Sequence, residues 1–285
     1  MNGLSKPWNC QIEIVRGCNL RCNFCGIHTI PPEKVYMSNG TFVSSVTSLI
    51  SFDPIRLEFA MRGEPTLHPE FIHMVNVARH FLPKSQLTLT TNGIKLTRDS
   101  AIDWFRHGGN VIVVDCYNNT FDKYKERFHG LPVYDFHAGE FNPWHRHSDS
   151  TKAIVLVEDI GQSKGKAQRV ILNQAGNVDW DRVKKYGVVP LKEPLKKKCV
   201  HPFREIAIFV DGSVSLCCRD WGQEAVLFNV NDTGINLEKE WYENKQWEDA
   251  RKALYNKDRS GLKICSRCDF HGGFRQGFLP KEYKL

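Results

Sequence analysis

Three cysteines lie close together near the start of the sequence, at Cys18, Cys22 and Cys25, with the spacing C-x3-C-x2-C. A structural zinc site is usually closed by four ligands, so zinc would need a fourth one here, such as His28. A four-iron cluster held by three cysteines keeps one iron without a protein ligand. That iron can bind the amino and carboxylate groups of a small molecule. The spacing therefore favours an iron–sulfur cluster with one open iron.

A second set of cysteines lies in the last third of the chain. Cys265 and Cys268 form a C-x2-C chelating pair, and Cys217 follows Gly212 in a G-x4-C pattern. Together with Cys199 these residues supply four thiolates, which are enough to ligate a [4Fe–4S] cluster fully. A four-cysteine zinc site has the same ligand spacing and is the alternative.

Cys217 and Cys218 are neighbours in the sequence. On an extended strand their side chains would point to opposite faces, so one can bind iron while the other faces elsewhere. The spare thiol is then either a hydrogen donor or a small buried hydrophobe. Cys10 and Cys116 have no partner at a ligand spacing, and we expect both to pack in the core.

Other residues that could bind a ligand follow the predicted strands. Gly63 lets the backbone approach a ligand closely, and Glu64 offers an acceptor for an ammonium group. Barrel and open α/β folds bind ligands at the carboxyl ends of their strands, so we expect these residues to share one mouth with the first cysteines. The set comprises Arg62, Gly63, Glu64 and Pro65 after strand 55–60, Thr91 and Asn92 at the end of strand 87–91, and Asp115 after strand 111–114.

Short β-branched runs alternate with amphipathic segments from residue 10 to about residue 180, which predicts βαβ units and a parallel sheet. The predicted strands are 11–16, 55–60, 87–91, 111–114, 133–136, 154–157 and 170–172, and the predicted helices are 40–50, 70–81, 98–106 and 121–128.

The segment 137–150 interrupts this alternation and is predicted to be a loop beside the mouth. His137, His145 and His147 in it are candidate substrate contacts, and a solvated histidine is the alternative for each.

The pattern changes near residue 190. Residues 190–198 read as a linker, and Asp211-Gly212 between two apolar runs predicts a hairpin over 206–216. A helix is predicted over 247–254. A chain of 285 residues has room for about two domains, and we expect them at 1–190 and 191–285.

Charge, hydropathy and cysteine content indicate which partners and which cellular compartment to expect. The net charge of +7 permits anionic partners, and a nucleic acid is possible, but no RNA- or DNA-binding module is recognisable. No apolar run reaches the ~18 residues of a membrane span, and the N-terminus lacks the apolar core of a signal peptide. We expect a cytoplasmic protein without a membrane partner, whose ten cysteines bind metal and do not form disulfides.

With Phe24 as the aromatic residue, the first cluster reads C-x3-C-x-aromatic-x-C, which resembles the signature of the radical S-adenosylmethionine (radical SAM) superfamily. The resemblance implies a partial (β/α)6-type parallel barrel whose open iron chelates SAM. The segment from Arg62 to Pro65 resembles the family's GGEP motif, which holds the SAM amino group, although Arg62 replaces the first glycine. The segment Thr91-Asn92-Gly93 resembles the one that helps to hold the ribose.

The second set of cysteines resembles the SPASM/twitch extension of many radical SAM enzymes. The chain has too few cysteines for the two-cluster version, so the resemblance implies a small α+β extension, hairpin plus helix, with one auxiliary [4Fe–4S] cluster. The family pattern favours Cys217 as the ligand and leaves Cys218 free.

The resemblance implies an enzyme that reductively cleaves SAM to a 5′-deoxyadenosyl radical and abstracts a hydrogen atom from a substrate carbon. Its partners would be the substrate and a one-electron reductant such as flavodoxin or ferredoxin. The reaction stays open: oxidation by a dehydrogenase, epimerisation with Cys218 as hydrogen donor, or isomerisation of a sugar, peptide or (hyper)modified nucleotide. Non-enzymatic alternatives are an iron–sulfur electron carrier or redox sensor, and a zinc-binding nucleic-acid module. Glu64 and Asn92 argue against a carrier, which has no use for an amino-acid cradle.

Overall fold

The computed structural model of the chain describes residues 4–116, 121–138, 153–159 and 174–270. The predicted strand 170–172, His145 and His147 lie outside these ranges. Within them, no helix is long and apolar enough to cross a membrane.

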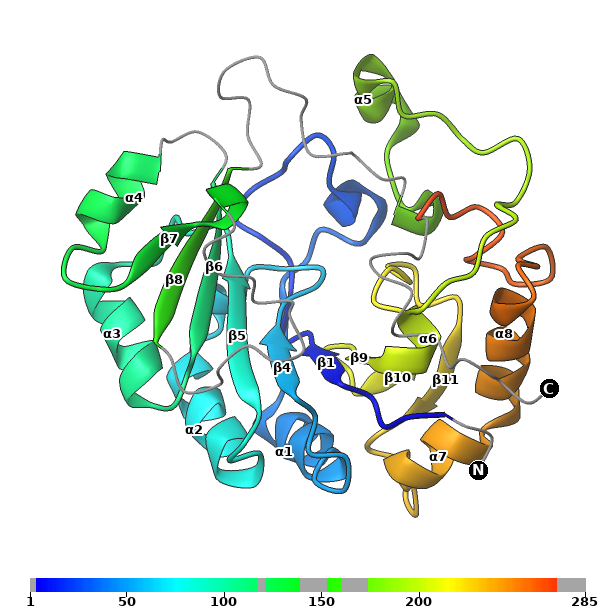
Figure 1. Ribbon diagram of the computed structural model, residues 1–285, viewed down its shortest axis with the longest axis horizontal. Coiled ribbons are helices and arrows are strands. Elements are labelled where there is room, and N and C mark those ends of the chain that lie inside the picture. The colour runs from blue at the N-terminus through cyan, green and yellow to red at the C-terminus, as the bar shows by residue number, and fades with distance from the viewer. Residues whose placement is uncertain (1–3, 117–120, 139–152, 160–173, 271–285) are drawn as a thin grey trace.

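A single curved sheet of nine strands organises the described part of the chain (Figure 1). All of its pairings are parallel except those of β10 with its two neighbours. The fold class is therefore α/β with a largely parallel sheet, as expected, and resembles a partial barrel. From one edge to the other the strands are β11 (Val226–Asn229), β10 (Ser213–Ser215), β9 (Glu205–Ile208), β1 (Asn9–Ile12), β4 (Arg56–Phe59), β5 (Gln86–Thr91), β6 (Val111–Cys116), β8 (Ile154–Asp159) and β7 (Val133–Asp135).

Four helices cover the outer face of the parallel strands in Figure 1: α1 (Asn39–Ser48), α2 (Phe71–Phe81), α3 (Arg98–Arg106) and α4 (Phe121–Arg127). Local signals fix their ends. The side chain of Ser38 caps α1 by accepting from the backbone N–H of Thr41, and Thr97 and Ser100 form a reciprocal capping box at α3.

Side chains alternate between the two faces of the sheet. On β6, Ile112 and Val114 join the main core, whereas Val111 and Val113 belong to a smaller apolar cluster with residues of β8. This period of two follows from the pleat of a strand. The inner face of the barrel is therefore apolar where Val111 and Val113 of β6 pack against Ile154 and Leu156 of β8.

The C-terminal part of the chain extends the same sheet. Strand β9 pairs in parallel with β1, and β10 and β11 continue the sheet as an antiparallel hairpin. The predicted Asp211-Gly212 turn connects β9 to β10, with Gly212 in the left-handed region at φ +86°. The helices of this part are α6 (His201–Arg204), α7 (Leu237–Glu243) and α8 (Lys245–Tyr255).

One expected element was wrong, and the condition set for the two adjacent cysteines is not met. The segment 11–16 is not one strand: β1 covers Asn9–Ile12, and β2 (Val15–Arg16) pairs separately with β3 (Val35–Tyr36). Cys217 and Cys218 do not lie on an extended strand, because β10 ends at Ser215 and the chain turns there. The sequence patterns also gave no indication of α5 (Trp180–Val183), α6, α7, β3, β11 or a separate β2.

Candidate active site

The loop that carries the first three cysteines is fixed to the loop after β4 by backbone contacts. The N–H of Gly17 donates to the carbonyl of Arg62 over 3.2 Å, and the N–H of Glu64 donates to the carbonyl of Gly17 over 3.0 Å. A Cβ on Gly63 would lie 2.0 Å from the carbonyl oxygen of Val15, so only glycine fits this close approach. The two loops are thus joined to each other at Gly17.

Asn92, at the end of β5, contacts the cysteine loop as well. The side-chain amide of Asn92 donates to Sγ of Cys18 over 3.4 Å and to the side-chain carbonyl of Asn19 over 2.8 Å. The backbone N–H of Leu20 also donates to Sγ of Cys18, over 3.3 Å. These donors favour the thiolate form, which is the form that binds metal, although burial outweighs them and raises the pKa of Cys18.

The three thiols repel one another electrostatically when ionised. Burial, together with the charges of Cys22, Cys18 and Asp115, raises the pKa of Cys25 to about 12. A cation bound between these groups would remove that repulsion, so the donor set fits an iron–sulfur cluster. The ring of His28 uses its Nε2 to donate to the carbonyl of Cys22 over 3.2 Å, so this nitrogen does not act as a fourth zinc ligand.

Glu64 is buried and held from several sides. Its Oε1 accepts from the N–H and hydroxyl of Thr66, over 3.1 and 2.7 Å, and from the hydroxyl of Thr91 over 2.6 Å. Its Oε2 accepts from the N–H of Asn92 over 2.8 Å. Since a carboxylate offers about four lone-pair sites, Oε2 keeps room for one more donor such as an ammonium group.

The remaining predicted cofactor contacts have mixed surroundings. Pro65 begins the 3-10 turn Pro65–Leu67, directly after Glu64. Phe24 packs against the small apolar cluster of Val178, Val183 and Val188. The Arg62 side chain is buried and bonded within the protein, to Glu13. His137 is described only by its backbone, at the 3-10 turn Phe136–Ala138.

The second set of cysteines lines one cavity. Cys199, Cys217, Cys265 and Cys268 all line it, although they come from three separate places in the sequence. Burial raises the pKa of Cys199 to about 11 and that of Cys265 to about 12. Buried thiols of this kind are neutral alone and ionise when they bind metal.

A histidine adds a further donor atom to this cavity, and the sequence analysis missed it. His201 is buried, and its Nδ1 donates to Oε2 of Glu205 over 2.8 Å. Its Nε2 has no hydrogen-bond partner among the described residues, although the ring lines the cavity. A buried polar atom of this kind fits a cavity that a metal group fills.

Cys217 and Cys218 occupy different surroundings. Only Cys217 lines the cavity, although both Sγ atoms lie within 4.8 Å of a ring nitrogen of His201. The two Sγ atoms nevertheless lie within 4.8 Å of each other, so the turn after β10 does not separate the two thiols as strand alternation would have done.

Charged residues line β4, and sequence reasoning did not single them out. Nε of Arg56 donates to Oδ1 of Asn9 over 2.8 Å, and Nη2 of Arg56 donates to Oε2 of Glu58 over 3.0 Å. The hydroxyl of Thr90 donates to Oε1 of Glu58 over 2.9 Å. The signal was present, because Arg56 and Glu58 alternate with Leu57 in an otherwise apolar strand.

This chain belongs to the radical SAM superfamily. The model of that superfamily matches residues 12–168, which is more than half of the chain. A second model, of the SPASM iron–sulfur cluster-binding domain, matches residues 199–269.

Curated relatives share these parts to different extents. The chain is 22% identical over 262 residues to the S-adenosyl-L-methionine-dependent 2-deoxy-scyllo-inosamine dehydrogenase of Niallia circulans, with 91% of each chain covered. It is 24% identical over 185 residues to the GTP 3′,8-cyclase of Pasteurella multocida, and the match covers 60% of this chain and 47% of the cyclase. The chain therefore spans most of the dehydrogenase and about half the length of the cyclase.

Solved structures show the same fold. The crystal structure of BtrN in complex with AdoMet and 2-DOIA superposes with a TM-score of 0.71 at 18% identity, covering 95% of this chain and 96% of that one. Native anSMEcpe with bound AdoMet gives 0.53 at 16% identity, with 97% and 93% covered.

The protein is thus a radical SAM enzyme that uses SAM, a SAM-binding [4Fe–4S] cluster and an auxiliary iron–sulfur cluster. When bound, these cofactors supply the 5′-deoxyadenosyl radical that takes a hydrogen atom from a substrate carbon. The chain's own residues bind and orient the reactants and keep water out, since the difficult chemistry belongs to the cofactors.

Proposed function

We propose that the enzyme is a dehydrogenase that oxidises a hydroxyl-bearing carbon of a small polar molecule, such as a sugar or cyclitol. Removal of a hydrogen atom, followed by loss of one proton and one electron, converts an alcohol to a carbonyl. The auxiliary cluster is the electron acceptor in this scheme. A relative that matches 91% of the chain is a dehydrogenase, which supports the same reaction class here.

One observation carries the proposal: the four cysteines of the extension converge on one cavity. We assign Cys18, Cys22 and Cys25 to the SAM-binding cluster, and Cys199, Cys217, Cys265 and Cys268 to the auxiliary cluster. An auxiliary cluster held by four thiolates has no open iron for substrate, so electron transfer is the role that suits it.

The barrel interior supports a polar substrate. Arg56 and Glu58 are buried on β4, and Glu158 is buried on β8. Burying several charges is costly unless they bind one another or a ligand. A polyhydroxylated molecule can donate to the carboxylates and accept from the guanidinium. We place Glu64, Thr91, Asn92 and Asp115 around SAM, with residues 1–190 as the barrel and 191–285 as the extension.

Epimerisation is the second candidate, and the placement of Cys218 favours it. Its thiol does not line the auxiliary cavity, although its Sγ lies within 4.8 Å of Sγ of Cys217, and in this scheme it would deliver a hydrogen atom to a substrate radical. A peptide or modified nucleotide would serve as substrate in the same way. In either reaction a flavodoxin or ferredoxin would supply the first electron.

Product analysis in deuterated water separates these candidates. The enzyme is reconstituted anaerobically and supplied with SAM, a strong reductant and a panel of sugars and aminocyclitols. A dehydrogenase gives a product two mass units lighter without solvent deuterium at the oxidised carbon. An epimerase gives an isomer with one deuterium at the inverted carbon, because thiol hydrogens exchange with solvent. Absence of 5′-deoxyadenosine would reject both and favour an electron carrier or redox sensor.

A further inference from the structure

Arg62 stands where the related motif has glycine, and its side chain is fully buried. Its Nε donates to Oε1 of Glu13 over 2.7 Å, and its Nη2 donates to Oε2 of the same carboxylate over 2.6 Å. Neither side chain is more than 2% exposed. The carboxylate also accepts from the backbone N–H of Val210, over 3.1 Å. A bidentate pair of this geometry fixes both partners in one orientation.

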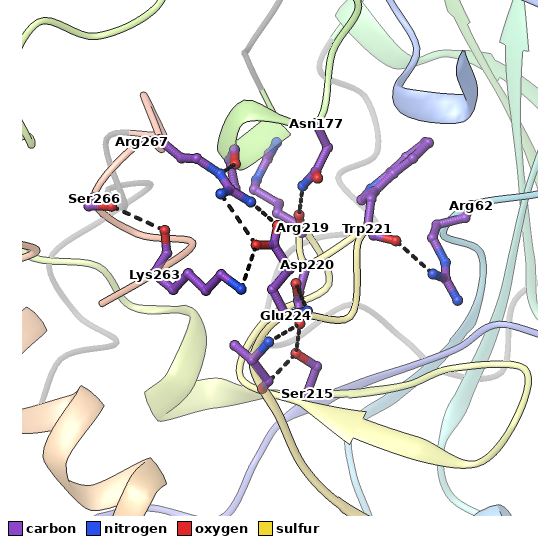
Figure 2. Close-up of polar contacts among 12 residues, drawn as sticks. Arg62, Asn177, Ser215, Arg219, Asp220, Trp221, Glu224, Lys263, Ser266 and Arg267 are labelled. Atoms are coloured by element: carbon purple, nitrogen blue, oxygen red, sulfur yellow. Dashed lines mark hydrogen bonds and ion pairs between the residues drawn. The ribbon is translucent and has the colours of Figure 1, made fainter. Parts of the chain in front are cut away.

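The remaining nitrogen of Arg62 reaches into the extension. Its Nη1 donates to the backbone carbonyl of Trp221 over 2.7 Å, as Figure 2 shows, and to Oε1 of Gln223 over 3.2 Å. The guanidinium carbon also lies 4.2 Å from the centre of the Phe209 ring. All three contacts lie more than 140 positions away in the sequence, in the hairpin that carries Cys217.

Trp221 in turn covers the loop of the first three cysteines. Its indole belongs to an apolar cluster with Ile27 and Ile30, against which Cys18 and Cys25 pack. A Cβ on Gly26 would lie 2.6 Å from the indole, so glycine is required for this fit. Trp221 itself is buried, with 7% of its surface exposed. The extension therefore contributes one wall around the cysteine loop.

We propose that Arg62 is a positioning residue that holds Trp221 of the extension over the three-cysteine loop. The set Glu13, Arg62 and Trp221 is called the latch below. In this arrangement Trp221 shields the cluster bound by Cys18, Cys22 and Cys25 from solvent and oxygen, a role that rests on the proposed ligand assignment. Glycine at position 62 would leave Glu13 buried without its partner and Trp221 without this tether.

The first test replaces the charged pair without leaving one charge buried, in the double variant Glu13→Gln/Arg62→Met. Arg62→Lys is the conservative variant, because it keeps the charge beside Glu13 but loses the planar guanidinium, whose Nη1 also donates to the carbonyl of Trp221. Arg79→Met is the matched control: Arg79 in α2 donates to the backbone carbonyls of Leu82, Pro83, Ser85 and Gly108, and lies outside the latch.

Hydrogen–deuterium exchange of the reconstituted enzymes measures the latch directly. In the double variant we expect exchange to rise at least tenfold in two segments, 17–30 and 217–224, with a smaller rise in Arg62→Lys. The helices α2 and α3 should keep wild-type protection. Wild-type exchange in both segments, or the same rise in Arg79→Met, would overturn the proposal.

Air exposure measures the shielding. The reduced enzyme with SAM has an electron paramagnetic resonance signal from the SAM-binding cluster, and we expect this signal to disappear at least tenfold faster in the double variant. Equal rates in wild type and variant overturn the shielding role. A wild-type enzyme whose signal does not respond to SAM would instead contradict the ligand assignment under Proposed function, while the exchange result still decides the latch.

Discussion

The backbone N–H of Asn92 donates to Oε2 of Glu64 over 2.8 Å, joining the ends of β5 and β4 across 28 positions of sequence. The Asn92 side chain then contacts Sγ of Cys18. These two residues thus connect the carboxylate predicted to hold the SAM amino group with the cysteine loop predicted to hold the cluster.

Replacing Glu64 should weaken SAM binding and leave both clusters in place. The Glu64→Gln variant keeps the shape of the side chain but loses the charge that faces an ammonium group. Loss of such a bond typically costs about 1.5–3 kcal/mol, which is a tenfold or larger rise in the Kd for SAM. Equilibrium titration of the reconstituted enzyme measures it, with Glu70→Gln as a nearby acidic control that should bind normally. Equal affinity in Glu64→Gln would remove Glu64 from the SAM site.

Iron content should report two clusters. After anaerobic reconstitution we expect about eight irons per chain, and about four after Cys18, Cys22 and Cys25 are replaced together by alanine. A wild-type value of about four would contradict the auxiliary cluster, and zinc in place of iron would indicate the structural alternative. Metal analysis by inductively coupled plasma mass spectrometry distinguishes these results.

The two adjacent cysteines should behave differently. Because only Cys217 lines the auxiliary cavity, Cys217→Ala should lose about four irons, whereas Cys218→Ala should keep about eight. Cys116→Ala, a buried cysteine on β6, serves as the control and should also keep its iron. Iron loss in Cys218→Ala alone would reverse the two roles.

Local patterns were enough to predict most helices and strands. The helix expected over 98–106 is α3 over the same residues, because its capping residues and apolar positions are local signals. The proximity of Glu64, Asn92 and Cys18 was also predictable, because the carboxyl ends of neighbouring parallel strands lie at the same edge of a sheet. Contacts between segments far apart in the sequence could not be predicted. The bonds from Arg62 to Glu13 and Trp221 depend on how the extension docks, and no sequence spacing encodes that.

Buried Asp220 was also missed, although its partners Ser215, Glu224 and Ala225 lie within five residues of it, and its loss should destabilise the extension. Its carboxylate accepts from the hydroxyl of Ser215 over 2.6 Å and from the N–H groups of Glu224 and Ala225, each over 2.8 Å (Figure 2). Asp220→Ala leaves these buried donors unsatisfied, at a cost of about 2–4 kcal/mol.

Anaerobic thermal unfolding, followed by circular dichroism, measures this cost as a lower midpoint. The exposed Asp249→Asn serves as the control and should shift the free energy of unfolding by no more than about 0.5 kcal/mol. An unchanged midpoint for Asp220→Ala would show that the loop does not depend on this carboxylate.

Glu224, between β10 and β11, forms ion pairs with the segment that carries Cys265 and Cys268. It forms ion pairs with Arg267, which lies between Cys265 and Cys268, and with Lys263 over 3.1 Å (Figure 2). These side chains are partly exposed, so salt screens the attraction. We expect Glu224→Gln to release auxiliary-cluster iron to a chelator several times faster than wild type at low salt. The difference should shrink at high salt; a salt-independent rate would contradict an electrostatic tether.

The position of β1 between β4 and β9 also determines when the protein can finish folding. Ile12 pairs with Ile208, so one edge of β1 has no partner until the nascent chain has grown by almost two hundred residues. At about 5–20 residues per second this takes roughly 10–40 s. During that time the half-built sheet carries an open edge able to pair with other chains. Production in cells therefore depends on what protects that edge on the ribosome, and a chain truncated before β9 should aggregate instead of folding as an isolated barrel.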